Sequence, residues 1–236
     1  MACQTKRTAK THGDNVNQSE AASVPANGLQ EARRADLRLI ADNLAIVRNG
    51  RSIFSGLSFA LGSGELIAVR GPNGAGKSTL LRIVAGLLAP TAGHVALEPK
   101  DEGDGAPAAH YVGHLDGLKP SLTVGANLDF WRRVWSGTGS VSVALEAVGL
   151  GDLGHLHVRT LSAGQRRRLA LARLSIAERP IWLLDEPTTA LDQSGEALLG
   201  ALLARHLAGG GMAMVATHRD LPVAATRTLS LGGGAT

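Results

Sequence analysis

A phosphate-binding motif constrains the fold of this chain more than any other feature. Residues 71–79 match G-x-x-x-x-G-K-[ST] at every fixed position and read Gly71, Pro72, Asn73, Gly74, Ala75, Gly76, Lys77, Ser78 and Thr79. Apolar residues precede and follow the motif, which predicts a strand, a loop and a helix. Glycines permit the sharp turn, and backbone N–H groups at a helix N-terminus attract phosphate oxygens. We therefore expect a loop that binds ATP or GTP, with Lys77 against the β- and γ-phosphates and Ser78 as a ligand of Mg²⁺.

Length and apolar content exclude a pore and a second nucleotide domain. The 236 residues suffice for one large domain with a buried core. The longest apolar runs, such as 181–184, fall far short of the ~20 residues that cross a bilayer. Residues 1–34 are polar, contain the single cysteine Cys3 and lack the apolar segment of a secretory signal. We expect residues 1–34 to be a disordered extension, and the protein to stay in the cytoplasm.

The charge balance gives no reason to expect a nucleic-acid partner. The chain has 24 Lys and Arg against 20 Asp and Glu, which is a net charge of +4. Its three Phe, three Trp and one Tyr are too few for a platform that stacks bases. A basic, solvated surface is therefore the favoured interpretation, with no nucleic acid bound.

The order of predicted elements is typical of an α/β fold. Apolar stretches at 37–47 and 53–59 flank Asn49-Gly50, a dipeptide that predicts a tight hairpin and hence an antiparallel β edge. A strand follows at 93–97, and the Gly- and Pro-rich stretch 99–109 predicts a mobile surface loop. Helical apolar spacing over 122–175 predicts an inserted helical subdomain. The α/β pattern then returns, with a strand at 181–184, a helix at 193–207, a strand at 212–217 and a short final helix and strand.

Two further motifs carry chemistry that a phosphate loop alone does not supply. Residues 161–165 read L-S-A-G-Q, in which Ser162 can cap a helix whose N-terminal amides attract an anion. Twenty residues after this motif, an apolar strand ends in Asp185 and Glu186. We expect Asp185 to hold Mg²⁺ and Glu186 to orient the water that attacks the γ-phosphate.

Together these motifs resemble those of ATP-binding cassette (ABC) ATPases, over about residues 37–232. The resemblance implies an α/β P-loop NTPase of the ABC type, with a mixed-sheet core, an antiparallel β edge and an inserted α-helical subdomain. A single ATPase domain would span 35–236, with the helical subdomain at about 115–177. It would be an ATP hydrolase and translocase, with ATP and Mg²⁺ as cofactors.

The same resemblance implies that two copies share each ATP. Ser162, Gly164 and Gln165 would contact the γ-phosphate bound to the other subunit, which makes a homodimer with ATP sandwiched between its halves. Residues 190–192 match the segment that contacts the partner subunit, and His218 matches a histidine that reaches the γ-phosphate. The catalytic set is therefore Lys77, Glu186 and His218.

Two positions depart from the usual pattern of the family. Arg48 stands where an aromatic side chain commonly stacks on adenine, so it either stacks through its guanidinium plane or is an exposed hairpin arginine. His114 stands where a glutamine commonly contacts Mg²⁺. Because neutral imidazole accepts a hydrogen bond or ligates weakly, we expect His114 to take that place.

One branch of the family is matched more closely than the others. Residues 113–114, 117–123, 127–131 and 161–168 resemble the ATP-binding subunits of haem exporters in cytochrome c maturation. That resemblance implies a peripheral protein on the cytoplasmic face of the bacterial inner membrane, bound to separate transmembrane subunits. Hydrolysis would drive release of a haem-loaded chaperone. Haem would be met only indirectly, since the chain has no C-x-x-C-H motif and the pair His155 and His157 is typical of a solvated loop.

Three alternatives share part of this chemistry. The chain could serve another importer or a drug exporter, which differ in their membrane partners. It could be a soluble ABC ATPase of translation or DNA repair, although it lacks the second cassette or long coiled-coil insertion usual there. A scaffold that binds ATP without hydrolysis is the third alternative, and Glu186 and His218 argue against it.

Overall fold

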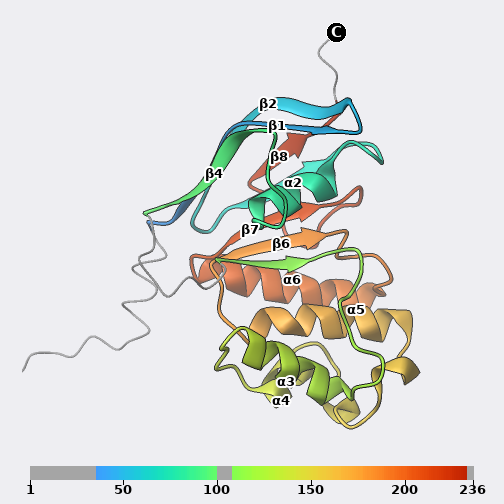
Figure 1. Cartoon of the computed structure of the whole chain (residues 1–236). Coiled ribbons are helices and arrows are strands. Elements are labelled where there is room, and N and C mark those ends of the chain that lie inside the picture. Colours follow the sequence, from blue (N-terminus) through green and yellow to red (C-terminus); the bar gives the residue numbers. More distant parts are fainter. Residues whose placement is uncertain (1–35, 100–107, 233–236) are drawn as a thin grey trace, which may run out of the picture.

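The computed structural model describes residues 36–99 and 108–232. The extension expected at 1–34 and most of the loop expected at 99–109 lie outside the described residues. The described part folds into two sheets with helices between and below them (Figure 1).

An antiparallel sheet forms the upper layer in Figure 1. It consists of β1 (Arg38–Arg48), β2 (Arg51–Gly62) and β4 (Ala92–Glu98), in the order β2-β1-β4. Asn49 and Gly50 both have positive φ, 50° and 72°, as a two-residue hairpin turn that follows the strand twist requires. The predicted antiparallel β edge is therefore confirmed.

The central sheet is parallel and has five strands. Its members are β3 (Leu66–Arg70), β5 (Ala109–Val112), β6 (Ile181–Asp185), β7 (Met212–Ala216) and β8 (Arg227–Ser230), in the order β5-β6-β7-β3-β8. The three inner strands are apolar and almost wholly buried. Their alternate residues pack into two separate cores, because successive side chains point to opposite faces of a sheet.

The helices occupy both faces of the central sheet. The short α2 (Lys77–Val84) packs between the two sheets. On the other face lie α3 (Val124–Val134), α4 (Val141–Glu146), α5 (Ala163–Ala172) and α6 (Gln193–Ala208). Of these, α3, α4 and α5 all come between β5 and β6 in the chain, in the region where helical spacing was predicted.

Two predictions from the sequence differ from the structure near the edges of the central sheet. The predicted short final helix is wrong, since residues 217–226 form bends and irregular chain that lead directly into β8. There Leu221, Val223 and Ala225 pack against the core at every second position, a spacing that suits extended chain. The strand β5 was not predicted, because it has only four residues and follows the Gly- and Pro-rich stretch.

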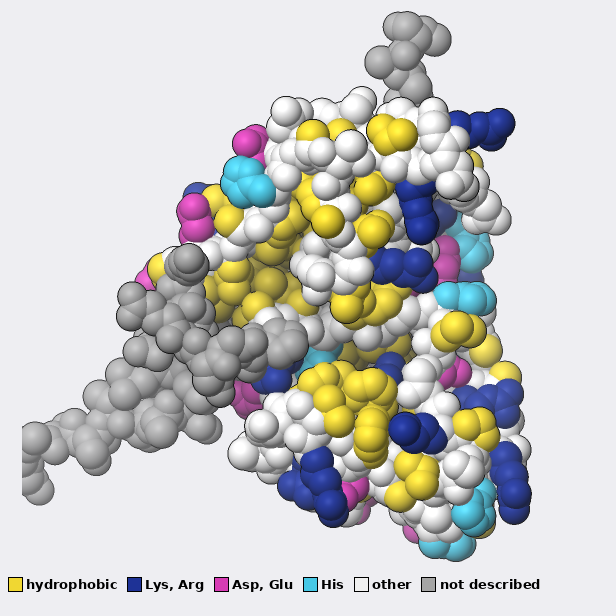
Figure 2. Space-filling view, viewed as in Figure 1, with side chains coloured by type: hydrophobic (Ala, Val, Ile, Leu, Met, Phe, Trp, Pro, Cys, Tyr) yellow, Lys and Arg dark blue, Asp and Glu magenta, His cyan; other side chains and the backbone are white. Residues whose placement is uncertain are grey.

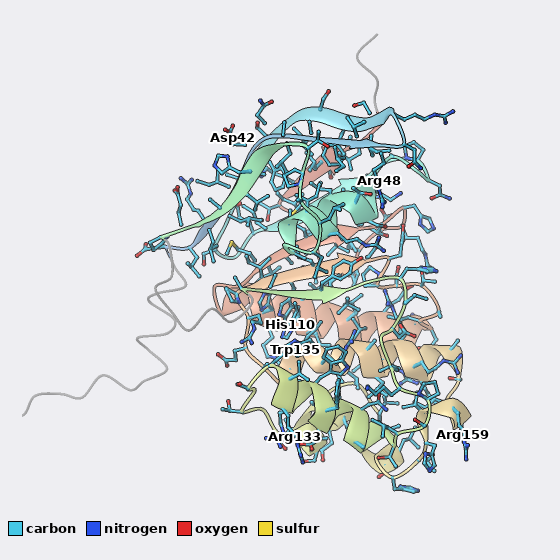
Figure 3. All side chains as sticks on the ribbon, viewed as in Figure 1. Asp42, Arg48, His110, Arg133, Trp135 and Arg159 are labelled. Atoms are coloured by element: carbon cyan, nitrogen blue, oxygen red, sulfur yellow. The ribbon has the colours of Figure 1, made fainter. Side chains whose placement is uncertain are left out.

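The imidazole of His110 on β5 is buried between the sheet and the helices. It is 2% exposed, and its Nε2 lies 2.6 Å from the carbonyl oxygen of Ala177. The centroids of the His110 and Trp135 rings are 4.7 Å apart (Figure 3). Burial lowers the pKa of His110 to about 4, because the interior disfavours the imidazolium. Between about pH 6.5 and pH 4, His110 is therefore protonated in the unfolded chain and neutral in the folded chain.

Stability should consequently fall as the pH drops through this window. The contribution of His110 approaches about 1.4 kcal/mol per pH unit between its unfolded and folded pKa values. Thermal unfolding at pH 7 and pH 5 measures the loss. The His110→Gln variant retains an N–H donor for Ala177 without a titrating ring, so its unfolding temperature should fall less than that of the wild type. Equal losses in the two proteins would assign the pH dependence to other groups.

Candidate functional site

The loop at residues 71–76 joins β3 to α2, and its shape depends on two glycines. Gly71 and Gly76 have φ of 149° and 97°. A Cβ atom on Gly71 would lie 2.3 Å from the carbonyl oxygen of Leu231, and one on Gly76 would lie 2.5 Å from Cγ2 of Ile53. The loop can therefore approach β8 and the β1–β2 hairpin only because both residues lack a side chain.

The N-terminus of α2 has no side-chain cap, whereas the other four α-helices within residues 36–99 and 108–232 have one. Ser, Thr or Asp side chains cap α3, α4, α5 and α6, and the residue before α2 is Gly76. The first N–H groups of α2 consequently lack a side-chain acceptor at the positive end of the helix dipole. This end of the helix suits an anion.

Lys77, the first residue of α2, is a buried cation that no carboxylate neutralises in the described part of the chain. It is 8% exposed, and its Nζ donates to the carbonyl oxygens of Gly71 at 2.7 Å and Pro72 at 3.2 Å. Because a buried ammonium is costly without a counter-charge, this position also suits an anionic ligand.

An open cavity of about 270 Å³ brings the loop together with the end of β6. It is lined by Arg48, Ile53, Asn73, Gly74, Gly76, Lys77, Ser78, Thr79, Asp185 and Glu186. The carboxyl ends of the parallel strands point toward the right-hand edge in Figure 1, and basic and histidine side chains gather along that edge in Figure 2. The structure thus places seven of the predicted phosphate and metal residues around one space, and exposed Arg48 borders it at the end of β1 (Figure 3).

Asp185 and Glu186 differ in their surroundings although they are adjacent. Asp185 ends β6 and is 3% exposed. Glu186 follows with a left-handed φ of 47°, and its Oε1 lies 3.1 Å from Nδ1 of His218. Since a carboxylate only accepts, Nδ1 of His218 carries the proton in this contact. The other oxygen, Oε2, is buried with no hydrogen-bond partner among the described residues.

The donor set at this cavity fits Mg²⁺ bound together with phosphate. In proteins Mg²⁺ is held by one or two carboxylates, with waters and phosphate oxygens completing its shell. Ser78 and Asp185 supply one hydroxyl and one carboxylate on the same cavity. In the described ranges no group of three or more His, Cys, Asp or Glu forms a metal site of its own.

Residues 161–165 (L-S-A-G-Q), called the signature segment from here on, do not line this cavity within one chain, and neither does His114. His114 lines a smaller cavity of about 110 Å³ with Asp116, Ala163, Arg166, Arg167, Glu186, Thr189 and Ala190, so Glu186 is the one residue common to both. Ser162 and Gln165 form a reciprocal capping box at the start of α5. A Cβ atom on Gly164 would lie 2.9 Å from the carbonyl oxygen of Ala190, which explains a glycine there.

Two residues near Asp185 escaped the sequence prediction. The hydroxyl of Tyr111 lies 3.5 Å from Oδ2 of Asp185 and accepts from Nε of Arg82 at 3.4 Å, and burial raises the pKa of its phenol. Tyr111 was missed because β5 was not predicted. Arg167 is buried on α5 against the end of β6. A signal for Arg167 existed, since it shares helical spacing with buried Ala170 and Leu171.

Comparison with known proteins then decides the family. Residues 54–189, more than half of the chain, match the family described as ABC transporter. The chain belongs to the ABC transporter family. It is an ATP-binding and ATP-hydrolysing transporter subunit. None of the helices described here combines the length and apolar character that a bilayer span requires.

Individual relatives of this ABC protein cover most of the chain. The "Cytochrome c biogenesis ATP-binding export protein CcmA" of Nitrobacter winogradskyi is 53% identical over 201 residues, which cover 84% of this chain and all of that protein. A protein of the same name from Chelativorans sp. is 50% identical, with the same coverage. The solved structure of a putative ABC transporter ATP-binding protein from Pyrococcus furiosus has a TM-score of 0.70 at 21% identity, and covers 82% of this chain and 97% of that one. This last likeness supports the fold.

Proposed function

We propose that this chain is the ATP-hydrolysing subunit of an export system for cytochrome c biogenesis, in which hydrolysis drives release of a haem-loaded chaperone. The observation that carries the proposal is the similarity to two proteins named "Cytochrome c biogenesis ATP-binding export protein CcmA", over the whole length of each. The site supports the chemistry, because one cavity borders the phosphate loop, Asp185 and Glu186. Haem would be handled by other subunits.

The residues of the cavity suit phosphoryl transfer to water. The uncapped end of α2 and Lys77 would bind the polyphosphate, and Ser78 and Asp185 would hold Mg²⁺. A bound Mg²⁺ would neutralise negative charge on the phosphate oxygens. His218 holds Oε1 of Glu186, which leaves Oε2 to accept a hydrogen bond from the attacking water. Arg48 borders the space available to the base, and His114 approaches Glu186 from the second cavity.

A second copy completes the site in this proposal. Ser162, Gly164 and Gln165 line no part of the phosphate-loop cavity of their own chain. A partner could present them, together with the N-terminus of α5, to the γ-phosphate when two copies close on ATP. Each copy would be a single domain over 35–236, with its helical subdomain at about 115–177. The dimer would lie on the cytoplasmic face of the inner membrane, against separate transmembrane subunits.

Complementation tests the assignment to cytochrome c biogenesis. In a bacterial host that lacks its own subunit of this kind, the wild-type chain should restore c-type cytochromes, measured by haem staining of membrane proteins. The Lys77→Met variant should not restore them. The Arg159→Gln variant, altered at an exposed position outside both cavities, should. If purified wild-type chain hydrolyses ATP yet no c-type cytochrome returns, the assignment to this export system is contradicted and an importer or drug exporter becomes the better candidate.

A further inference from the structure

Arg167 is a buried arginine whose guanidinium uses all five of its N–H donors. It is 4% exposed. Three bonds go to successive backbone carbonyls at the end of β6, namely Nη2 to Asp185 at 2.8 Å, Nη2 to Glu186 at 2.8 Å and Nε to Pro187 at 3.2 Å. The remaining two, from Nη1, reach the carbonyl of Gly113 at 2.9 Å and Oδ1 of Asp116 at 3.2 Å. One side chain thus connects three segments of the fold.

The geometry of this contact suits arginine alone among the side chains. A planar guanidinium presents five donors in a fixed fork, whereas a lysine ammonium presents three donors from one point and a glutamine amide two. No lysine or glutamine could bond to all five acceptors at once. The carbonyl of Glu186 also accepts from the N–H of Thr189 at 3.2 Å, so Arg167 supplies the second of its two hydrogen bonds.

The backbone held by Arg167 is strained at Glu186. A φ of 47° is uncommon for a residue with a side chain, and such a conformation persists only where its surroundings hold it. The N–H of Glu186 donates to Ala216 at 2.8 Å, and its carbonyl accepts from Arg167. Both peptide groups that flank its Cα are therefore fixed, and with them the direction in which the carboxylate leaves the backbone.

The other contacts of Arg167 extend this restraint beyond the strand. Gly113 and Asp116 lie just after β5, in the segment that contains His114, and Arg167 itself is on α5, which begins with the signature segment. A shift of either segment would alter the bonds that hold the backbone of Glu186. His114, Asp116, Arg167 and Glu186 also line the same small cavity.

We propose that Arg167 is a positioning residue for hydrolysis, which fixes the backbone of Glu186 and makes the placement of its carboxylate depend on the segment 113–116 and on α5. The inference rests on the proposed role of Glu186 in activating water. Arg167 does not line the phosphate-loop cavity and acts through Glu186.

Arg167→Lys tests the inference, because it keeps the charge and loses the fork. The turnover number of the purified chain should fall by about 10- to 100-fold, the range expected when a catalytic group is displaced by about 1 Å. The affinity for ATP, measured with a fluorescent analogue, should stay within about twofold, since the phosphate loop is untouched. The Arg159→Gln variant is the matched control at an exposed arginine and should hydrolyse ATP as the wild type does. A turnover number equal to that of the wild type in folded Arg167→Lys would overturn the inference.

A double-mutant cycle separates positioning from a general loss of structure. In a Glu186→Gln background, single-turnover measurement of the residual rate should show no further effect of Arg167→Lys beyond about twofold, because the group through which it acts is gone. An equal loss in both backgrounds would show that Arg167 acts independently of Glu186. If Glu186→Gln alone hydrolyses at the wild-type rate, the proposed function of Glu186 fails instead, so the two failures are distinguishable.

Asp116→Ala provides a second variant that removes one acceptor and leaves Arg167 in place. If Arg167→Lys does not fold, judged by circular dichroism and thermal unfolding, this variant carries the test. Its turnover number should fall roughly fivefold with unchanged ATP affinity, the order expected for one lost hydrogen bond. The loss should vanish in the Glu186→Gln background. Wild-type turnover in folded Asp116→Ala would contradict the link to the segment 113–116.

Discussion

Replacing Glu186 by Gln should lower ATP turnover by about 10²- to 10⁴-fold, the usual contribution of a general base. The amide oxygen can still accept from Nδ1 of His218, so the side chain keeps its place. The second oxygen, which has no partner among the described residues, becomes an NH₂ group that cannot accept a proton from water. Binding of ATP should persist, because the phosphate loop and Lys77 are unchanged.

Phosphate release and equilibrium binding of a fluorescent ATP analogue measure the two effects separately. With MgATP, this variant should also accumulate as a dimer in size-exclusion chromatography if two copies share each nucleotide as proposed, since that nucleotide would no longer be hydrolysed. Glu146→Gln on α4 is the control, because Glu146 is exposed and outside both cavities. Normal hydrolysis by Glu186→Gln would remove the role proposed for Glu186.

Replacing Lys77 by Met should have opposite effects on binding and on stability. ATP affinity should fall by at least about 100-fold, since charge-assisted hydrogen bonds to phosphate are the strong class. The free protein should unfold at the same temperature as the wild type or above it, because Met keeps the buried stem and removes a buried ammonium without a carboxylate partner in the described part of the chain. A residue with a purely structural role would not separate these two measurements.

Titration with nucleotide and thermal unfolding without nucleotide provide the comparison. Lys119→Met is the control, as Lys119 is exposed and its Nζ lies over the ring of Phe130, away from both cavities. If Lys77→Met binds ATP with wild-type affinity, the phosphate loop is not the nucleotide site.

Much of the fold could be predicted from local sequence, for reasons that particular elements illustrate. The inner strands β3, β6 and β7 are apolar runs, in which only the last residues Arg70 and Asp185 are charged, and this is the pattern of strands buried on both faces. The hairpin follows from Asn49-Gly50, which tolerates positive φ. Edge elements were harder to predict. The four-residue β5 takes its conformation from pairing with β6. Residues 217–226 form no helix, because Leu221, Val223 and Ala225 pack against the core at every second position.

The candidate site divides in the same way. The sequence identifies some site residues because their neighbours in the chain belong to the same motif. These residues are Gly71, Gly76, Asp185 and Glu186. Tyr111 and Arg167 are not recognisable from their neighbours. Tyr111 meets Asp185 across 74 positions, and Arg167 meets Gly113 across 54. Such contacts depend on how strands and helices pack, and no local preference records them.

The sequence by itself determined the family chemistry of this protein: a phosphate loop before a helix, two carboxylates at the end of a strand, and a helix capped by the serine of L-S-A-G-Q. These features are local, since backbone freedom, caps and apolar runs act over a few residues. Only the tertiary structure decided which of them meet. It placed the carboxylate of Glu186 beside His218 and its carbonyl oxygen in a hydrogen bond from Arg167. The signature segment lines no part of the phosphate-loop cavity of the same chain. The physical reason is that contacts between residues far apart in the sequence depend on the order of the strands in the sheet and on helix packing, which are properties of the whole chain.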